Sequence, residues 1–451
     1  MENFKNLRNP ILPLKYHVPD SEAHVMPDGM LYIYGSFDNR DDVYCSEEYH
    51  VVSTADMENW TIYDKSMDGN DVPWFRDPDA PKYPGIDWSK PTPFIQKMLA
   101  AMKENGDDMM ENFEQEDENP PALLFAPDCI YKDGKYYLYF CMKDDSEGVA
   151  VSDSPMGPFE NPVRFPIGGI DPAIFIDDDG QAYYYWGQLF SHGVKLNPDM
   201  VSFDPEGIVD DLVTEEVHCF HEGSSMRKIG DNYYYIYADM ERGKPTSLGY
   251  SMAKSPLGPF TYKGIIIDND GCDPQSWNNH GSIECFQGQW YVFYHRCSRN
   301  SQMHRRLCVE KIYINEDGTI DEVKMTSQGV GEPFGPGEKI MGYQACGLSG
   351  SIYIGVDADH EEKLMGISKG DTAVFRYVKS GNGFQKIHIT VSGGGRVKIL
   401  LNETCVGTAE ISPEKGIHEI TAEIVSEPGE FELMLQIEES ENLEIFDLIL
   451  D

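Results

Sequence analysis

Three acidic residues stand at similar places in the sequence, each just before an apolar or aromatic run: Asp20, Asp171 and Glu222. Burying a carboxylate without a partner is costly, so packing alone does not account for acids at the start of buried strands. Carboxylates that share one site repel each other, and their pKa values therefore separate. One can then act as a base while another keeps its proton, which is the division that glycoside hydrolysis needs.

The first 300 residues repeat one unit, in which a glycine-containing turn is followed by an aromatic strand. The units lie at residues 28–34, 133–139, 179–186, 230–237 and 287–294. The last four recur about every fifty residues, a spacing typical of propeller blades. An all-β fold with a five-bladed β-propeller is predicted, and its equivalent positions converge at one end of the central axis. Each acid taken alone is explained as a turn or cap residue, and only the matching repeat positions favour a shared site.

Two domains are predicted: a catalytic propeller over residues 1–340 and a β-sandwich (jelly-roll) domain over residues 341–451, where short alternating runs replace the aromatic strands. An insertion at about residues 90–121 separates the first two units. Residues 94–102 within it have helical apolar spacing, and the acidic tract after them is expected to be a solvated loop. The insertion either shapes an entrance to the propeller or is peripheral.

The charge balance excludes some partners. The 451 residues include 36 basic and 77 acidic residues, for a formal net charge of −41, which argues against nucleic acid and anionic membranes. No signal peptide or membrane-length apolar run is visible, so a cytoplasmic location is expected. Ten scattered cysteines fit free thiols in a reducing compartment, and no organic cofactor is expected. The sequence leaves the oligomeric state open.

The acidic motifs, taken together, resemble those of glycoside hydrolase family 43. The resemblance rests on the opening residues 9–13, Ala-Pro-Asp at 126–128, Ile-Asp-Pro at 170–172 and His-Glu-Gly at 221–223. It implies a five-bladed propeller and an inverting mechanism. Asp20 would be the general base that activates water, Glu222 the general acid, and Asp171 the residue that orients the acid and tunes its pKa. Ser21 departs from the proline that commonly follows the base in the family.

The resemblance also implies supporting residues. Asp128 is expected to support substrate binding, although an ordinary acid at the start of a strand is the alternative. His280 is expected to face the channel, where family members often hold calcium through water. Calcium prefers oxygen ligands, so a hydrogen-bonded buried histidine is the other interpretation. Arg296 is expected either to bind substrate hydroxyls or to pair with the acidic cluster.

Three aromatic residues are candidates for stacking against a sugar: Phe37, Trp74 and Trp186. The apolar faces of sugars pack on aromatic rings, but core packing explains each of these residues equally well.

The C-terminal stretch, especially residues 366–371 and the strands that follow, resembles a family 6 carbohydrate-binding module. Such modules usually carry a tryptophan in a binding loop, whereas all six tryptophans of this chain precede residue 291. The domain is therefore expected to pack on the propeller as structural support.

The resulting hypothesis is an exo-acting glycosidase on small pentose-containing oligosaccharides, most simply an α-L-arabinofuranosidase, with β-D-xylosidase as the close alternative. A retaining fructosidase would match residues 75–78 and 283–285, but the Asn-Asp-Pro-Asn nucleophile motif is missing. A non-catalytic glycan- or protein-binding propeller is the alternative from a different class, and it predicts that the three acids do not converge.

Overall fold

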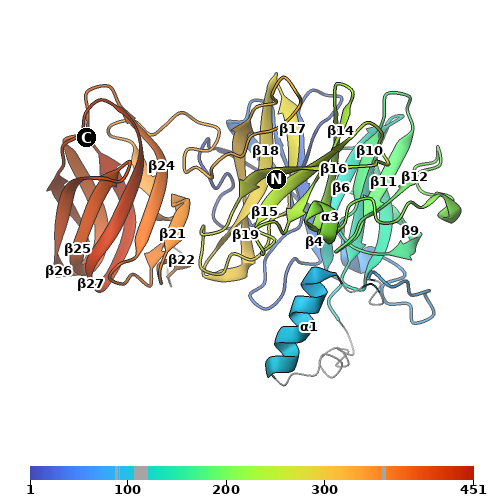
Figure 1. Ribbon diagram of the computed structural model, residues 1–451, viewed down its shortest axis with the longest axis horizontal. Helices are drawn as coiled ribbons and strands as arrows, with labels where there is room; N and C mark the ends of the chain where they lie inside the picture. Colours follow the sequence, from blue (N-terminus) through green and yellow to red (C-terminus); the bar gives the residue numbers. More distant parts are fainter. Residues whose placement is uncertain (87–89, 91, 106–119, 358–361) are drawn as a thin grey trace.

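The computed structural model describes residues 1–86, 90, 92–105, 120–357 and 362–451. Two β domains lie side by side in Figure 1, and one helix, α1, projects away from the larger domain. None of the helices within the described residues has the length and apolar character that crossing a membrane requires. All ten cysteines are free thiols and seven of them are buried, as expected.

The N-terminal domain is the predicted five-bladed propeller. Each blade is an antiparallel meander that starts at the channel. The first blade contains β2 (Glu22–Val25), β3 (Leu31–Gly35), β4 (Glu48–Thr54) and β5 (Asn59–Asp68), with β1 (Glu2–Lys5) on its outer edge, and the second contains β6 (Leu124–Lys132), β7 (Lys135–Met142), β8 (Ser146–Ser152) and β9 (Glu160–Gly168). The third blade contains β10 (Ala173–Ile176), β11 (Ala182–Trp186) and β12 (His192–Lys195), and the fourth contains β13 (Phe220–Ile229), β14 (Asn232–Asp239), β15 (Ser247–Ala253) and β16 (Thr261–Asp268). The fifth blade contains β17 (Ser282–Phe286), β18 (Gln289–Ser298) and β19 (Ser301–Ile312).

The predicted aromatic runs form the second strand of each blade, where most side chains are buried against neighbouring blades. Two of their tyrosines make equivalent contacts. The hydroxyl of Tyr34 donates to the carbonyl of Pro155, and that of Tyr185 to the carbonyl of Pro256, each at 2.8 Å. Both prolines lie in Ser-Pro-x-Gly-Pro-Phe turns. The repeat seen in the sequence thus corresponds to a repeated contact between blades.

The ring of blades closes through contacts between residues far apart in the chain. The inner strands contact one another in the order β2, β6, β10, β13 and β17, and β17 returns to β2. Ser21 and Gly281 form a parallel bridge at this junction, and the amide of Ile11 donates to the carbonyl of Leu307 at 3.0 Å. Closure is the step that brings the starts of the inner strands together.

The helix expected in the insertion is present as α1 (Pro93–Asn105). Ile95 is buried with Leu189 and Phe190, which attaches the helix to the propeller. Most of the acidic tract expected to be a loop lies outside the described residues. The remaining helical segments are short: η1 (Gly69–Asp71), η2 (Pro205–Gly207), α3 (Glu215–His218) and η3 (Gly342–Gln344).

The C-terminal domain confirms the predicted β-sandwich, built as one strongly curved eight-stranded sheet. Its longest strand, β27, pairs with β20, β23, β24 and β25, so the sheet folds back over a single apolar core. The strands are β20 (Lys339–Met341), β21 (Gly347–Ser349), β22 (Tyr353–Val356), β23 (Glu362–Met365), β24 (Thr372–Ser380), β25 (Lys386–Leu401), β26 (Thr404–Glu423) and β27 (Gly429–Leu450).

The two domains are joined by buried polar contacts. The Glu362 carboxylate, from the C-terminal sheet, pairs with Arg306 and Arg299 of the propeller. The amide of Ser327 also donates to the carbonyl of Arg376 at 2.6 Å. Separating the domains would leave the Glu362 charge without its partners, so the contact fits the expected role of the C-terminal domain as structural support.

Candidate active site

The three predicted acids lie together. Asp20, Asp171 and Glu222 line one cavity of about 410 Å³ where the inner strands β2, β10 and β13 begin. The volume is within the range of roughly 300–1,000 Å³ that is typical of small-molecule sites. His280 and Arg305 line the same cavity. These five residues are called the site cluster below.

The backbone at two of the acids is unusual. Asp20 has φ of 56° and Asp171 has φ of 57°, so both adopt the left-handed conformation at equivalent turns before their strands. Non-glycine residues rarely adopt this conformation, and strained positions of this kind concentrate at functional sites. The two turns point both carboxylates into the cavity instead of along the strand faces.

Asp20 is held in its ionised form. Arg305 donates to its Oδ1 at 2.8 Å and Ser36 to its Oδ2 at 2.6 Å. Burial acts to raise the pKa of Asp20, but Arg305, with smaller contributions from His280 and His295, brings that pKa below its ordinary value. A buried carboxylate that stays ionised is suited to accept a proton.

Arg305 is itself fixed by a second buried carboxylate. Its Nε and Nη2 each lie 2.9 Å from the two oxygens of Asp38, and its guanidinium lies 4.9 Å from the centre of the Tyr44 ring. A planar guanidinium held on two sides keeps one orientation. Asp38 therefore sets the direction from which Arg305 approaches Asp20.

Asp171 has the opposite electrostatic situation. Its Oδ2 accepts from the amide of Gly223 at 2.9 Å, and no Lys or Arg pairs with it within the described residues. Burial raises its pKa well above the ordinary value, and the nearby carboxylates of Glu222 and Asp20 raise it further. Asp171 consequently retains a proton at a pH where an isolated carboxyl would be ionised.

Glu222 contacts neutral side chains. Gln188 donates to its Oε2 at 2.6 Å and Asn278 to its Oε1 at 3.4 Å. The ring of His221 is the nearest basic group that pairs with it in the described structure, at 3.8 Å. The cavity therefore combines an ionised carboxylate, Asp20, with a carboxyl that retains its proton, Asp171, and general acid–base chemistry requires such a difference.

A second charged group lies further along the inner strands. It comprises residues from β2, β6, β13 and β17 and is called the channel cluster: Glu22, His24, Asp128, Arg227 and Glu284. Arg227 pairs with Glu22 at 2.6 Å and with Glu284 at 3.2 Å, and His24 pairs with Asp128 at 2.7 Å. The ligand atoms of Glu22, His24 and Asp128 lie within 4.8 Å of one another. Arg227 and His24 engage Glu22 Oε1 and Asp128 Oδ1, whereas Glu22 Oε2 is buried without a hydrogen-bond partner in the described structure.

Four residues predicted to bind substrate do not line this cavity within the described structure. Trp186 is 3% exposed and stacks on Tyr184 inside a blade. Trp74 is 9% exposed and stacks on Phe140, and Phe37 packs beside His50. These rings fill space between sheets, which corrects the expectation that they stack against sugar.

The fourth of these residues is Arg296. It is buried and donates to Glu310, to the carbonyl of Thr326 and to the hydroxyl of Tyr294. Both alternatives for Arg296 are thereby wrong, because the arginine at the acidic cluster is Arg305.

Asp128 also lies outside the cavity lining. Its Oδ2 accepts from the amide of Ile174 at 2.7 Å, just after Asp171. Within the described residues, Asp128 therefore makes no contact as part of the cavity lining, and it supports the site by fixing the strand that follows a predicted catalytic acid.

The sequence analysis missed Arg305, Trp277 and the neighbours of Glu222. Two adjacent arginines in the apolar strand β19 were a usable signal, because buried arginines need partners. Trp277 lies three positions before the predicted site residue His280 and is 36% exposed at the cavity. Helix α1 also contributes Phe94, Ile95 and Met98 to the lining, so the insertion reaches the cavity.

The residues around His280 fit calcium only in part. Its Nδ1 lies 3.9 Å from Asp20 Oδ1 and 3.9 Å from Asp171 Oδ2. Calcium takes roughly six to eight oxygen ligands, and this donor set supplies two carboxylate oxygens and a ring nitrogen. An ion here would be held largely by water.

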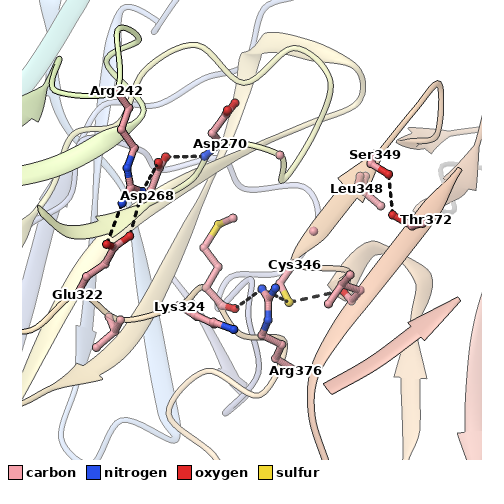
Figure 2. A pocket seen from close by; sticks show the side chains of 15 residues that line it. Arg242, Asp268, Asp270, Glu322, Lys324, Cys346, Leu348, Ser349, Thr372 and Arg376 are labelled. Atoms are coloured by element: carbon pink, nitrogen blue, oxygen red, sulfur yellow. Dashed lines mark hydrogen bonds and ion pairs between the residues drawn. The ribbon is translucent and has the colours of Figure 1, made fainter. Parts of the chain in front are cut away.

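A larger cavity, of about 610 Å³, lies between the two domains (Figure 2). Its charged side chains are engaged with one another: Arg242 pairs with Asp268 and Glu322, and Arg376 donates to the carbonyl of Met325. Among the described residues that line it, no two carboxylates lie together without a cation. Its chemistry therefore suits an interdomain contact better than acid–base catalysis.

Comparisons with known proteins agree with this chemistry. A model of the family "Glycosyl hydrolases family 43" matches residues 97–320. A "Xylosidase/arabinosidase" of Thermoclostridium stercorarium is 30% identical over 389 residues, which cover 75% of this chain and 72% of the relative.

Solved structures extend the similarity. A GH43 beta-xylosidase/alpha-arabinofuranosidase from a compost microbial metagenome, in complex with xylotriose, has a TM-score of 0.53 at 28% identity and covers 71% of this chain and 98% of its own. A family 43 arabinoxylan arabinofuranohydrolase from Bacillus subtilis shares the fold of both domains, with a TM-score of 0.52 at 23% identity and coverage of 98% and 97%.

Proposed function

The chain belongs to glycoside hydrolase family 43, and from this membership we propose an inverting exo-glycosidase that releases α-L-arabinofuranose from arabinoxylan or arabinan oligosaccharides. The observation that carries the proposal is the convergence of Asp20, Asp171 and Glu222 on one cavity. Their unequal pairing, with Arg305 at Asp20 and neutral partners at Glu222, supports different protonation states.

The proposed mechanism uses one acid on each side of the sugar. Asp20 takes a proton from a water molecule while that water attacks the anomeric carbon. Glu222 gives its proton to the glycosidic oxygen, and the bond to the leaving group breaks. The products are a free pentose of inverted configuration and the shortened oligosaccharide. Asp171 accepts from the amide of Gly223, next to Glu222, which supports its role in orienting the acid.

β-D-Xylosidase is the second candidate. The relative from Thermoclostridium stercorarium is named for both activities, and so is the metagenomic enzyme with xylotriose. The two pentoses present similar hydroxyls, so one carboxylate set can serve either.

Calcium beside His280 is part of the proposal, as a structural ion held mainly by water. When bound, it would offset negative charge between Asp20 and Asp171, and no catalytic step depends on it. We expect calcium to raise the Tm of the chelator-treated protein, and His280→Ala to remove that rise. An unchanged Tm on adding calcium would exclude the ion.

The test of the function is hydrolysis of nitrophenyl α-L-arabinofuranoside, nitrophenyl β-D-xyloside and an arabinosylated xylo-oligosaccharide. The preferred substrate identifies the pentose, and proton NMR of the fresh product gives the configuration. We expect the inverted anomer. A retained anomer would refute the mechanism, and no hydrolysis of any of the three would refute the function.

A further inference from the structure

One side of the cavity is apolar. Phe94 and Met98, from the first turns of α1, line it half-buried, and the indole of Trp277 lines it while 36% exposed. Large apolar side chains exposed in a concave site are typical of ligand-contacting surfaces. None of the three is among the residues that the acid–base mechanism uses.

Two of these side chains are linked to Glu222 through its neighbours. The ring of Phe94 meets the edge of the His221 ring at a centroid distance of 4.8 Å, and His221 precedes Glu222. Trp277 precedes Asn278, whose amide contacts Glu222 at 3.4 Å. Asp20 is instead surrounded by polar groups, including Arg305 and Ser36.

The position next to the acid decides what these residues meet. A general acid donates its proton to the oxygen of the leaving group, so the side chains around it face the leaving group. The side chains around the base face the attacking water. Phe94, Met98 and Trp277 therefore border the part of the substrate that departs.

The helical part of this surface is anchored. Ile95 is 1% exposed and packs on Leu189 and Phe190, and the amide of Phe94 donates to Glu215 Oε2 at 3.0 Å. A surface held in place before binding loses little conformational entropy when a ligand arrives. Leu99 lies on the same helix, is 44% exposed and does not line the cavity, so it is a matched control.

We propose that Phe94, Met98 and Trp277 form a binding site for the leaving group. This site selects a xylo-oligosaccharide over a small alcohol as the leaving group, an inference that rests on the proposed function. The flat apolar face of a pyranose ring packs on aromatic side chains, and a small alcohol has no such face. The insertion thus determines which chain the pentose is removed from.

The experiment compares two substrates that share one sugar and differ in the leaving group: methyl α-L-arabinofuranoside and an arabinosylated xylotriose. If xylose is the preferred sugar, methyl β-D-xyloside and xylotetraose replace them. We expect Trp277→Ala and Phe94→Ala each to lower the ratio of the oligosaccharide kcat/KM to the methyl glycoside kcat/KM by about tenfold, mostly through KM. Leu99→Ala should keep the ratio of the unmodified enzyme.

Binding of xylotriose, measured by calorimetry in the Glu222→Gln background, provides a readout without turnover. Adding Trp277→Ala should weaken the Kd about tenfold. Equal losses on both substrates, or the same loss in Leu99→Ala, would overturn the leaving-group site while the glycosidase function stands. If the unmodified enzyme cut neither substrate, the function would fail, and an unchanged xylotriose Kd would overturn the site separately.

Discussion

The site cluster and the channel cluster have the same composition. Each contains three carboxylates, one arginine and one histidine, and both are formed by residues at or near the inner strands of the propeller. They differ in pairing. Arg227 bridges two carboxylates of the channel cluster, and His24 pairs with the third. Within the site cluster, Arg305 forms an ion pair only with Asp20, because the rest of its guanidinium is paired with Asp38.

The two clusters also differ in whether a ligand can reach them. The site cluster lines a cavity, whereas none of the channel residues is among the described residues that line it. Composition alone therefore does not mark an active site. Weak charge pairing at a surface that a ligand can reach leaves protons to transfer, while an arginine that bridges two carboxylates in the interior holds strands together.

The test with the largest expected effect substitutes one carboxylate in each cluster by its amide. Glu222→Gln should lower kcat/KM on an arabinosylated xylo-oligosaccharide by about 10²- to 10⁴-fold, because the leaving oxygen loses its proton donor. Glu284→Gln, on the neighbouring inner strand, should change it by less than about threefold, because within the described residues Glu284 forms its ion pair with Arg227 and does not line the cavity. A large loss in a folded Glu284→Gln protein would contradict the division between the clusters.

Stability should respond in the opposite way. Arg227→Met leaves Glu22 and Glu284 without their cation, so the free energy of unfolding should fall by about 3–5 kcal/mol in urea titrations. Arg242→Met is the control, because its side chain is 45% exposed and its ion pairs should contribute at most about 1 kcal/mol. Equal losses in the two variants would show that burial does not distinguish these pairs.

The channel cluster should also make stability depend on pH. Burial raises the pKa of Glu22 to about 7, with Arg227 opposing and Asp128 adding to the rise. The folded state then holds a proton that the unfolded chain releases near pH 4.5, so this contribution to stability is lost as pH rises from about 4.5 to about 7. Relative to Glu22→Gln, the unmodified protein should lose roughly 3 kcal/mol across that window. Parallel stability curves for the two proteins would remove Glu22 as the cause.

The smallest expected effect concerns the pH profile of activity. The low pKa of Asp20 keeps the base ionised in mild acid, and the raised pKa of Asp171 keeps a proton on that side of the cavity towards neutral pH. Asp171→Asn removes a negative charge that helps retain this proton, so the alkaline limb of kcat/KM should move down by about one pH unit. Glu284→Gln should keep the limb where it is. A shift of the limb to higher pH in Asp171→Asn would contradict the assignment.

The propeller could be predicted because its blades are local. About fifty consecutive residues contain all the aromatic strands and glycine turns of one meander. The repeat could therefore be recognised in the sequence before any contact was known. The same repeat gave the acids equivalent positions, and Asp20, Asp171 and Glu222 do share one cavity. Their chemical roles stay predictions.

The errors have a common origin. Trp74 and Trp186 were chosen because aromatic rings suit sugars, but buried blade faces need the same rings for packing. Arg296 was predicted at the site and Arg305 was not, although the two are nine positions apart in one hairpin. Residue type in an inner hairpin does not indicate which side chain reaches the channel, because bulges and neighbouring blades decide that.

By itself, the sequence determined the repeated strands, the change from aromatic strands to short alternating strands after the propeller, and the acids at the starts of three blades. Each of these features depends on residues close together in the chain. The tertiary structure decided that Arg305 meets Asp20, although 285 positions separate them, and that α1 reaches Glu222 through His221. The physical reason is ring closure. Burial and charge pairing are set by all five blades at once, and only the closed ring defines which carboxylates remain without a cation.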